Sequence, residues 1–150
     1  MTRGSFYWHF NKRQDLLDAV LNNWKQKTTL YVIDKLEHSN ITAKGRLEKL
    51  LTPYFKTFPD SLSTEQAIRA WGLNDPAANK IIEDVDYQRI EYLYQLMLTT
   101  GLAELVALQY ARLSYYTRVG LYAQAAAPAL VERMLVMQSL LAIVEVQVEV

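Results

Sequence analysis

The sequence contains no cysteine, and it has only five glycines and four prolines among its 150 residues. Without cysteine there can be no disulfide scaffold, no thiolate catalysis and no zinc or iron–sulfur site with cysteine ligands. Few glycines and prolines leave long segments in which a helix can continue without interruption. The composition therefore favours long helices and excludes the chemistry that depends on cysteine sulfur.

Net charge is also lacking, because 16 basic residues are matched by 16 acidic residues. The chain as a whole is therefore not an electrostatic binder of nucleic acid, although residues 1–13 carry three basic side chains and no acidic one. The longest uncharged run, residues 119–131, contains Pro128 and is shorter than the roughly 18 residues of a membrane-spanning helix. With 51% hydrophobic residues the chain is typical of one folded domain. We expect no membrane span, no signal peptide and a cytoplasmic location.

Helical periodicity dominates the sequence. From Lys12 to about His38 apolar residues recur every three or four positions, which predicts one long helix with Asn11 as its N-cap. The pair Asp75-Pro76 is a strong start signal, with aspartate as N-cap and proline at the first helical position. The expected fold class is all-α.

The remaining boundaries follow from proline, glycine and capping residues. Residues 58–61 are expected to form a loop, and the alternating tail 144–150 is expected to be a frayed end. Further helices are expected from 43 to about 57 with a kink or early end at Pro53, from 63 or 64 to 71 with Gly72 as the stop, from 76 to a stop at Gly101, from 103 to 125 and from 128 to 145.

The N-terminal segment combines small residues, an aromatic cluster and the start of a long helix. It reads Thr2-Arg3-Gly4-Ser5-Phe6-Tyr7-Trp8-His9-Phe10, followed by Asn11-Lys12-Arg13-Gln14-Asp15-Leu16-Leu17. This segment closely resembles the recognition helix and linker of tetracycline-repressor-type (TetR family) transcriptional regulators. It departs from the family pattern in the order Asn11-Lys12, because the family usually has lysine before asparagine at this point.

The resemblance assigns the first residues to DNA. It implies that Thr2, Arg3, Gly4 and Ser5 lie near bases, and that Tyr7, His9 and Lys12 lie towards the phosphate backbone. Small side chains allow close approach to the major groove, and a guanidinium can contact bases or phosphates.

Residues 1–10 would then be the residual recognition helix of an incomplete helix-turn-helix, and residues 11–150 an effector-binding and dimerisation domain. The family's DNA-binding unit has two further helices before this segment, and a recognition helix needs its supporting helix to stay in the groove. We therefore expect these 150 residues not to bind operator DNA, although the intact parent protein does.

Ten tyrosines and three tryptophans bring polar hydroxyl and indole groups into an apolar body. The segment 67–71, followed by Asp75-Pro76, Val85-Asp86 and Arg89, resembles the middle of one branch of TetR-type effector domains. The alternative is that the aromatic side chains are core residues with satisfied hydroxyls. The resemblance implies that a small, apolar or aromatic effector binds among Tyr54, Phe58, Trp71, Tyr92, Leu96, Tyr115 and Tyr116.

The last two expected helices carry little charge and are apolar on more than one face. Apolar side chains follow one another there at spacings of three and four, as in a heptad seam. We expect these helices to pair across a two-fold axis into a four-helix homodimer interface of about 2,000 Å² or more. The alternative is the bundle core of a monomer. The expected interface residues are Leu105, Leu108, Arg112, Tyr115, Val119, Tyr122, Leu130, Met134, Met137, Leu141 and Val144.

Patterns typical of an enzyme are lacking. The two histidines, His9 and His38, have no spacing that indicates a nucleophile or a metal site. Acidic residues 83, 84 and 86 beside Arg89 are expected to form a solvated helix face. We expect no catalysis, no metal and no cofactor.

The function that the resemblance implies is that of a ligand-responsive TetR-type repressor, with its DNA-binding half incomplete in these residues. Effector binding would move the long helix that begins near Lys12 and so change the spacing of two recognition helices in the dimer. The alternative is a stand-alone helical module for ligand binding or dimerisation, without a role on DNA.

Overall fold

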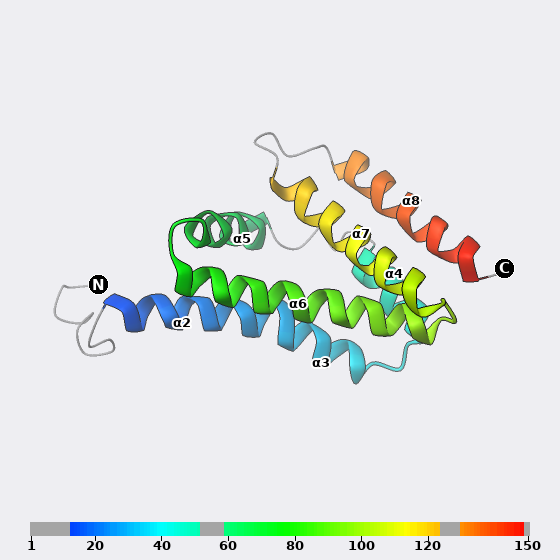
Figure 1. The fold of residues 1–150 in the computed structure, drawn as a ribbon, viewed down its shortest axis with the longest axis horizontal. Coiled ribbons are helices and arrows are strands. Elements are labelled where there is room, and N and C mark those ends of the chain that lie inside the picture. Colours follow the sequence, from blue (N-terminus) through cyan, green and yellow to red (C-terminus); the bar gives the residue numbers. More distant parts are fainter. Residues whose placement is uncertain (1–12, 52–58, 124–129, 149–150) are drawn as a thin grey trace.

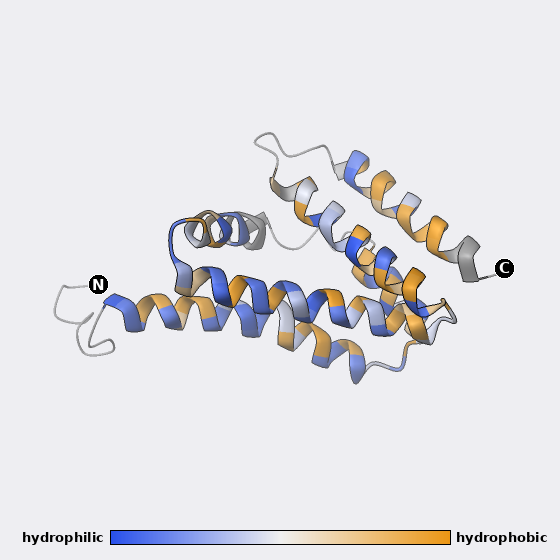
Figure 2. Ribbon diagram, in the orientation of Figure 1, coloured by the Kyte–Doolittle hydropathy of each residue, from blue (hydrophilic) through white to orange (hydrophobic). Residues whose placement is uncertain are grey.

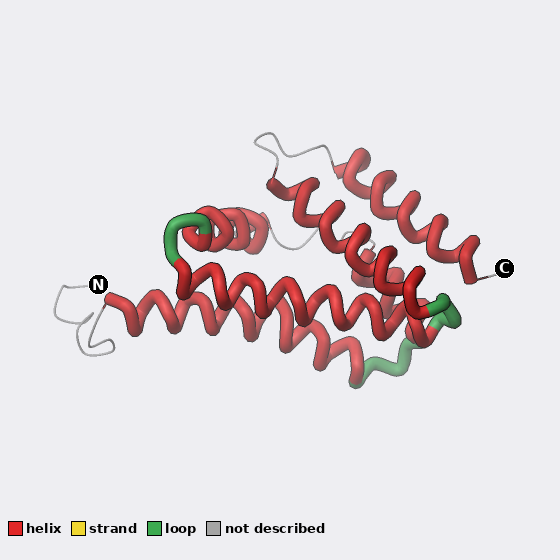
Figure 3. Tube along the Cα trace, in the orientation of Figure 1, coloured by secondary structure: helices red, strands yellow, loops and turns green. Residues whose placement is uncertain are grey.

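The computed structural model describes residues 13–51, 59–123 and 130–148, and every element within these ranges is a helix (Figures 1 and 3). The all-α class is thereby confirmed for the described part of the chain. The elements are α2 (Arg13–Lys25), the π-helix η1 (Gln26–Leu30), α3 (Tyr31–Glu37), α4 (Ala43–Leu51), α5 (Pro59–Gly72), α6 (Pro76–Thr99), α7 (Glu104–Ala123) and α8 (Leu130–Val148).

The long first helix is confirmed over residues 13–37, with one π-helical turn in its middle. In that turn the Tyr31 N–H donates to the carbonyl of Gln26, five residues back. The Thr28 hydroxyl also donates to the carbonyl of Trp24 at 2.8 Å. Such a threonine bond to the preceding turn competes with regular helix geometry, and π-turns recur where a helix carries functional groups.

The start and the end of α6 are those that the sequence predicts. The Asp75 carboxylate accepts from the backbone N–H groups of Ala77 and Ala78 at 2.9 and 3.1 Å, and Pro76 occupies the first turn. Gly101, just beyond α6, has a φ of 102°, which side-chain-bearing residues rarely adopt. These two residues fix the length of the longest helix.

Two predicted boundaries are wrong. The loop expected over 58–61 is helical from Pro59 onward, since proline is favoured at a first helical position and α5 begins there rather than at 63 or 64. The tail expected to fray from residue 144 is helical to Val148. Val144 is 2% exposed, so its packing outweighs the two-residue alternation of the tail.

The end of α5 at Gly72 is confirmed, but Gly72 does not adopt a left-handed conformation there. Among the described residues the positive-φ glycine is Gly101, so Gly72 does not supply that conformation. Instead, a Cβ at Gly72 would collide with the Cδ1 atom of Ile82 on α6. Any larger residue at position 72 would therefore require the Ile82 side chain to shift.

Helix α6 is the central element of the molecule. Figure 1 shows α2, η1 and α3 running along one side of α6, with α5 and α7 on the other and α8 beyond α7, and α4 packs on α6 and α8. The buried apolar residues form two clusters, and α6 contributes to both. The first contains Leu21, Trp24, Ile68, Ala78, Ile82 and Val85, and the second contains Leu47, Leu51, Leu93, Leu96, Met97, Leu102, Ala107, Ala111, Tyr115, Met137, Leu140 and Val144.

Candidate functional site

Polar side chains from four parts of the fold meet between the two apolar clusters. On α6 they fall between Val85 of the first cluster and Leu93 of the second. We call this group the central polar cluster. Its members are Thr28 and Thr29 from η1, Glu65 and Arg69 from α5, Asp86 and Arg89 from α6, and Tyr115 from α7.

Arg89 connects α6 to the long helix. Its Nε donates to the hydroxyl of Thr29 at 2.9 Å and its NH2 group donates to the hydroxyl of Thr28 at 3.0 Å. In a regular α-helix successive side chains diverge by about 100°, so the wider π-turn helps two adjacent threonines to reach one guanidinium. The guanidinium carbon also lies 5.4 Å from the centre of the Trp24 ring, a cation–π distance.

Arg69 is held by a different set of partners. It makes a two-pronged ion pair with Asp86, with N–O distances of 2.7 and 3.1 Å. It also donates to the hydroxyl of Tyr115 at 2.9 Å. The Tyr115 hydroxyl in turn donates to Asp86, and burial together with this carboxylate raises the pKa of Tyr115 to about 12. Tyr115 is therefore neutral at physiological pH.

Glu65 joins the two arginines through one carboxylate oxygen. Its Oε1 accepts from Arg89 at 2.8 Å and from Arg69 at 3.0 and 3.2 Å. Burial by itself would raise the pKa of Glu65, but the guanidinium of Arg89 outweighs it and holds that pKa below the usual value, with Arg118 and Arg69 adding to the effect. Glu65 is therefore charged at neutral pH and balances the arginines.

This cluster corrects one sequence-based expectation. Asp86 and Arg89 were expected on a solvated face, but the Arg89 side chain is 10% exposed and Asp86 is paired inside the fold. Asp84, from the same acidic run, forms an ion pair with Lys25 of α2 at 2.5 Å. Arg89 follows the apolar spacing of α6, because position 89 lies four residues from each of the buried positions 85 and 93. A charged residue on an apolar stripe was the available signal.

Three of the residues expected to line an effector pocket, Trp71, Tyr92 and Leu96, have different partners in the described part of the fold. Trp71 packs on the first apolar cluster and donates its indole N–H to Asp75 at 2.9 Å, whereas Leu96 is buried in the second. Tyr92 donates to Glu37 at 2.7 Å, a partner that Arg46 shares. These side chains have structural roles where they lie.

Two of the expected pocket residues, Tyr115 and Tyr116, lie in or next to the central polar cluster. Tyr115 belongs to that cluster, and the ring of Tyr116 meets it edge-on at 6.2 Å between ring centres. Tyr116 is 60% exposed, so it marks the rim rather than the interior. Tyr54 and Phe58 lie outside the described residues.

The residues expected at a dimer interface fall into two groups. Tyr115, Met137 and Val144 were expected at the interface. They are buried in the chain's own core, so their side chains are not exposed to a partner subunit. Leu105 and Arg112 are exposed, Leu108, Val119, Met134 and Leu141 are half-buried, and the side chains of Tyr122 and Leu130 are not described. The exposed large apolar residues of α7 and α8 are instead Leu105, Leu113, Tyr116, Val131, Leu135 and Ile143.

The residues assigned to DNA by resemblance, Thr2 to Lys12, all lie outside the described residues. What the structure does describe is the helix into which they lead, beginning with α2. In the described part of the chain, no helix is long and apolar enough to cross a membrane, and no group of three or more His, Asp or Glu side chains could hold a metal ion.

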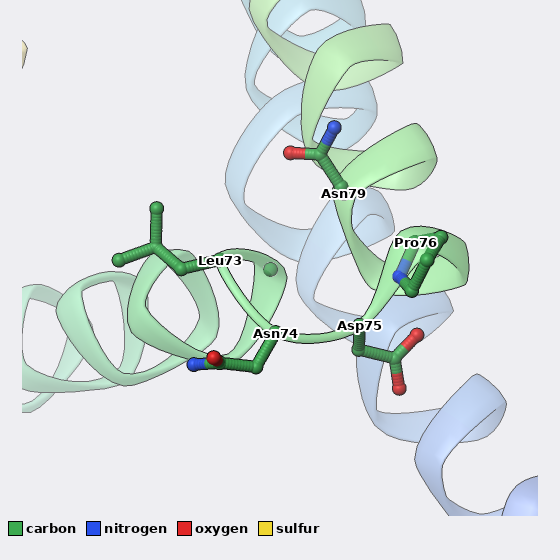
Figure 4. Close-up of a pocket in the computed structure, with 6 residues that line it drawn as sticks. Leu73, Asn74, Asp75, Pro76 and Asn79 are labelled. Atoms are coloured by element: carbon green, nitrogen blue, oxygen red, sulfur yellow. The ribbon is translucent and has the colours of Figure 1, made fainter.

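A shallow surface depression of about 340 Å³ lies at the turn between α5 and α6 (Figure 4). Asp75 lies at its edge, and the backbone N–H of Ala78 and the indole of Trp71 hold the pKa of Asp75 below its usual value. Its carboxylate is thus already used to cap α6 and to fix Trp71. Since the polar groups here serve the turn, we take the central polar cluster as the candidate site.

Comparisons of the chain with protein families, with curated proteins and with solved structures give no match.

Proposed function

We propose that this chain is the effector-binding and dimerisation part of a ligand-responsive transcriptional repressor of the TetR type. The observation that carries the proposal is the continuity between the motif of residues 2–17 and the helix of α2, η1 and α3. That helix is bonded to a buried polar site in the middle of the molecule through Thr28 and Thr29. The segment that the resemblance assigns to DNA thus comes directly before, in the sequence, the helix that carries part of the buried polar site.

This arrangement suggests how a signal would travel. Arg89 bonds the middle of the long helix to α6, and the ion pair between Lys25 and Asp84 bonds the two helices one turn nearer the N-terminus. An effector that changes the partners of Arg89 would shift the long helix relative to α6. In a dimer, such a shift would change the distance between the two recognition helices. They would then no longer match two DNA half-sites one helical turn apart, and the dimer would leave the DNA.

The dimer of the proposal would use the exposed apolar residues of α7 and α8. These two helices lie side by side at the edge of the molecule opposite α2 and α3 (Figure 1). Contiguous exposed apolar surface is typical of an interaction site, and a two-fold axis would place the same surface of a second copy against it. The side chains concerned are Leu105, Leu113, Tyr116, Val131, Leu135 and Ile143.

The test joins this chain to the part of the DNA-binding unit that precedes the recognition helix in TetR-type regulators. The first two helices of a TetR-type regulator are joined ahead of Thr2, and the chimera selects DNA from a random double-stranded pool. We expect enrichment of a palindromic site, and we expect Arg3→Ala to abolish it because the guanidinium reads bases or phosphates. Lys49→Ala, on the exposed side of α4, is the matched control and leaves selection unchanged.

The unmodified 150 residues should give no sequence-specific gel shift with the selected site at low salt. If the chimera folds and forms dimers but enriches no common sequence, the regulator proposal is wrong and the stand-alone helical module is favoured. If the unmodified chain itself binds the site with nanomolar affinity, the expectation that it lacks operator binding is wrong.

A further inference from the structure

The two arginines of the central polar cluster have partners other than Glu65. Arg89 is also bonded to Thr28 and Thr29 and lies against the Trp24 ring. Arg69 is also bonded to Asp86 in a two-pronged ion pair and to the Tyr115 hydroxyl. Each guanidinium therefore has anchors from other helices.

Glu65 differs from the two arginines in that its described hydrogen bonds all come from those arginines. Among the described residues its carboxylate is held by the two guanidinium groups, and both donate to the same oxygen, Oε1. Its side chain is 21% exposed, close to the 23% of Arg69 and the 29% of Asp86, so its carboxylate has a way out to solvent. A change of side-chain rotamer at Glu65 would free the position between the arginines while the arginines stay in place.

The position so freed suits an anion. Asp86 balances Arg69, and without the Glu65 carboxylate the charge of Arg89 has no carboxylate partner among the described residues. Guanidinium groups present N–H donors in a planar fork that fits a carboxylate. A cation would instead have to pair with Glu65 or Asp86 and displace an arginine that several other groups hold. The anchors therefore favour a negatively charged ligand.

The surroundings of this position are aromatic. The Trp24 ring lies on the Arg89 guanidinium, and the Tyr115 and Tyr116 rings meet edge-on beside it. The Trp24 indole N–H is buried and has no hydrogen-bond partner among the described residues, and its ring lies against Arg89. Aromatic walls favour a planar ligand body.

We propose that Arg69 and Arg89 bind the carboxylate of a small aromatic acid, and that Glu65 occupies the carboxylate position when the ligand is absent. This inference rests on the proposed function, because it names the chemical class of the effector at the candidate site. Glu65 is then an internal competitor, and ligand binding moves its carboxylate out from between α5 and α6.

The test compares probes that differ in charge but hardly in shape. Isothermal titration calorimetry of the full chain is run with benzoate and phenylacetate, with benzamide as the neutral control and benzylamine as the cationic control. We expect the acids to bind at least about tenfold more tightly than benzamide, because the neutral amide cannot form charge-assisted hydrogen bonds with the guanidinium groups. Benzylamine should not bind measurably.

The variant Glu65→Gln removes the competing charge and should lower the Kd for benzoate by about tenfold. Glu48→Gln, at an exposed glutamate of α4, is the matched control and leaves the Kd unchanged. Equal affinity for benzoate and benzamide in the wild type overturns the inference, and this comparison does not depend on the folding of any variant. Absence of binding by all the acids overturns it as well.

The outcome is separable from that of the proposed function. DNA selection by the chimera and the dimer mass are measured without any aromatic acid. If both succeed and the acids fail, the site takes another kind of effector. If the acids bind as expected but no DNA site is selected, the carboxylate site stands and belongs to a module without a role on DNA.

Discussion

Glu65 accepts hydrogen bonds from two guanidinium groups through one carboxylate oxygen, and it thereby joins Arg69 to Arg89 in the central polar cluster. Charged groups inside a fold add little net stability, because their desolvation offsets most of their attraction. Removing one partner nevertheless costs much, since it leaves the opposite charge buried and unpaired. The cluster is therefore better explained by a use in binding than by a contribution to the stability of the core.

At this scale the pH dependence of Glu65 can be predicted with its sign. Its pKa in the folded chain is held below the usual 4.5, so its stabilising effect is complete above pH 4.5 and is lost as the pH falls through the folded value. We expect Glu65→Gln to lower the free energy of unfolding by about 1–3 kcal/mol at pH 7. The difference from wild type should shrink as the pH falls below 4.5, because the unfolded chain then takes up the proton, and it should vanish below the lowered pKa, where the folded side chain is protonated too.

Urea unfolding of both proteins at a series of pH values between 7 and 3 measures this difference. Glu48→Gln serves as the control and should follow the wild type throughout. A gap between wild type and Glu65→Gln that stays constant down to pH 3 would mean that the ion pairs of Glu65 do not stabilise the fold.

The sequence could indicate part of the site but not its assembly. Arg89 occupies a position on the apolar stripe of α6, between Val85 and Leu93, and this alone marks it as unusual. Glu65 and Arg69, four residues apart on α5, look like an ordinary exposed pair on a helix surface. Arg69 meets Asp86, and Glu65 meets Arg89, only because of the way α5 crosses α6. The spacing of residues along one helix gives no information on that crossing.

At the scale of elements, capping chemistry was the most reliable guide. Asp75-Pro76 and Gly101 delimit α6 as predicted, because side-chain capping and a positive φ are properties of single residues. The start of α5 at Pro59 and the helical end of α8 were missed. Proline is compatible with both a loop and a first helical turn, and the packing of Val144 is a tertiary effect.

The approach of α5 to α6 at Gly72 gives a prediction at the same scale. Gly72→Ala places a methyl group against the Cδ1 atom of Ile82, which is 6% exposed and has little room to move. We expect a loss of about 1–3 kcal/mol in the free energy of unfolding, the usual effect of overpacking. Ile82→Val alone should cost about 1 kcal/mol through the lost methyl group.

The double variant distinguishes this contact from a general effect of alanine at the helix end. Because Ile82→Val removes the colliding atom, the two changes together should cost less than the sum of their separate effects. Denaturant unfolding of the four proteins measures the coupling. Strict additivity would show that Ile82 is not what requires glycine at position 72.

At the scale of the whole molecule, the question is what covers the outer side of α7 and α8. Figure 2 shows α8 as a largely hydrophobic helix, and of its large apolar side chains Met137, Leu140 and Val144 face the core. Leu135 and Ile143 remain 58% and 44% exposed. Exposed apolar surface along a whole helix is costly for a monomer and typical of a subunit interface.

If a second copy covers this surface, light scattering should give about twice the chain mass of 17.3 kDa. The variant Leu135→Glu/Ile143→Glu should give the monomer mass, because two carboxylates per subunit would be buried without partners. Leu73→Glu is the matched control: Leu73 is 86% exposed, lies at the turn between α5 and α6, and should leave the dimer intact. Circular dichroism checks that the variants keep their helices. A wild-type monomer, or a dimer that persists in the double variant, would mean that this face of α7 and α8 does not join two subunits.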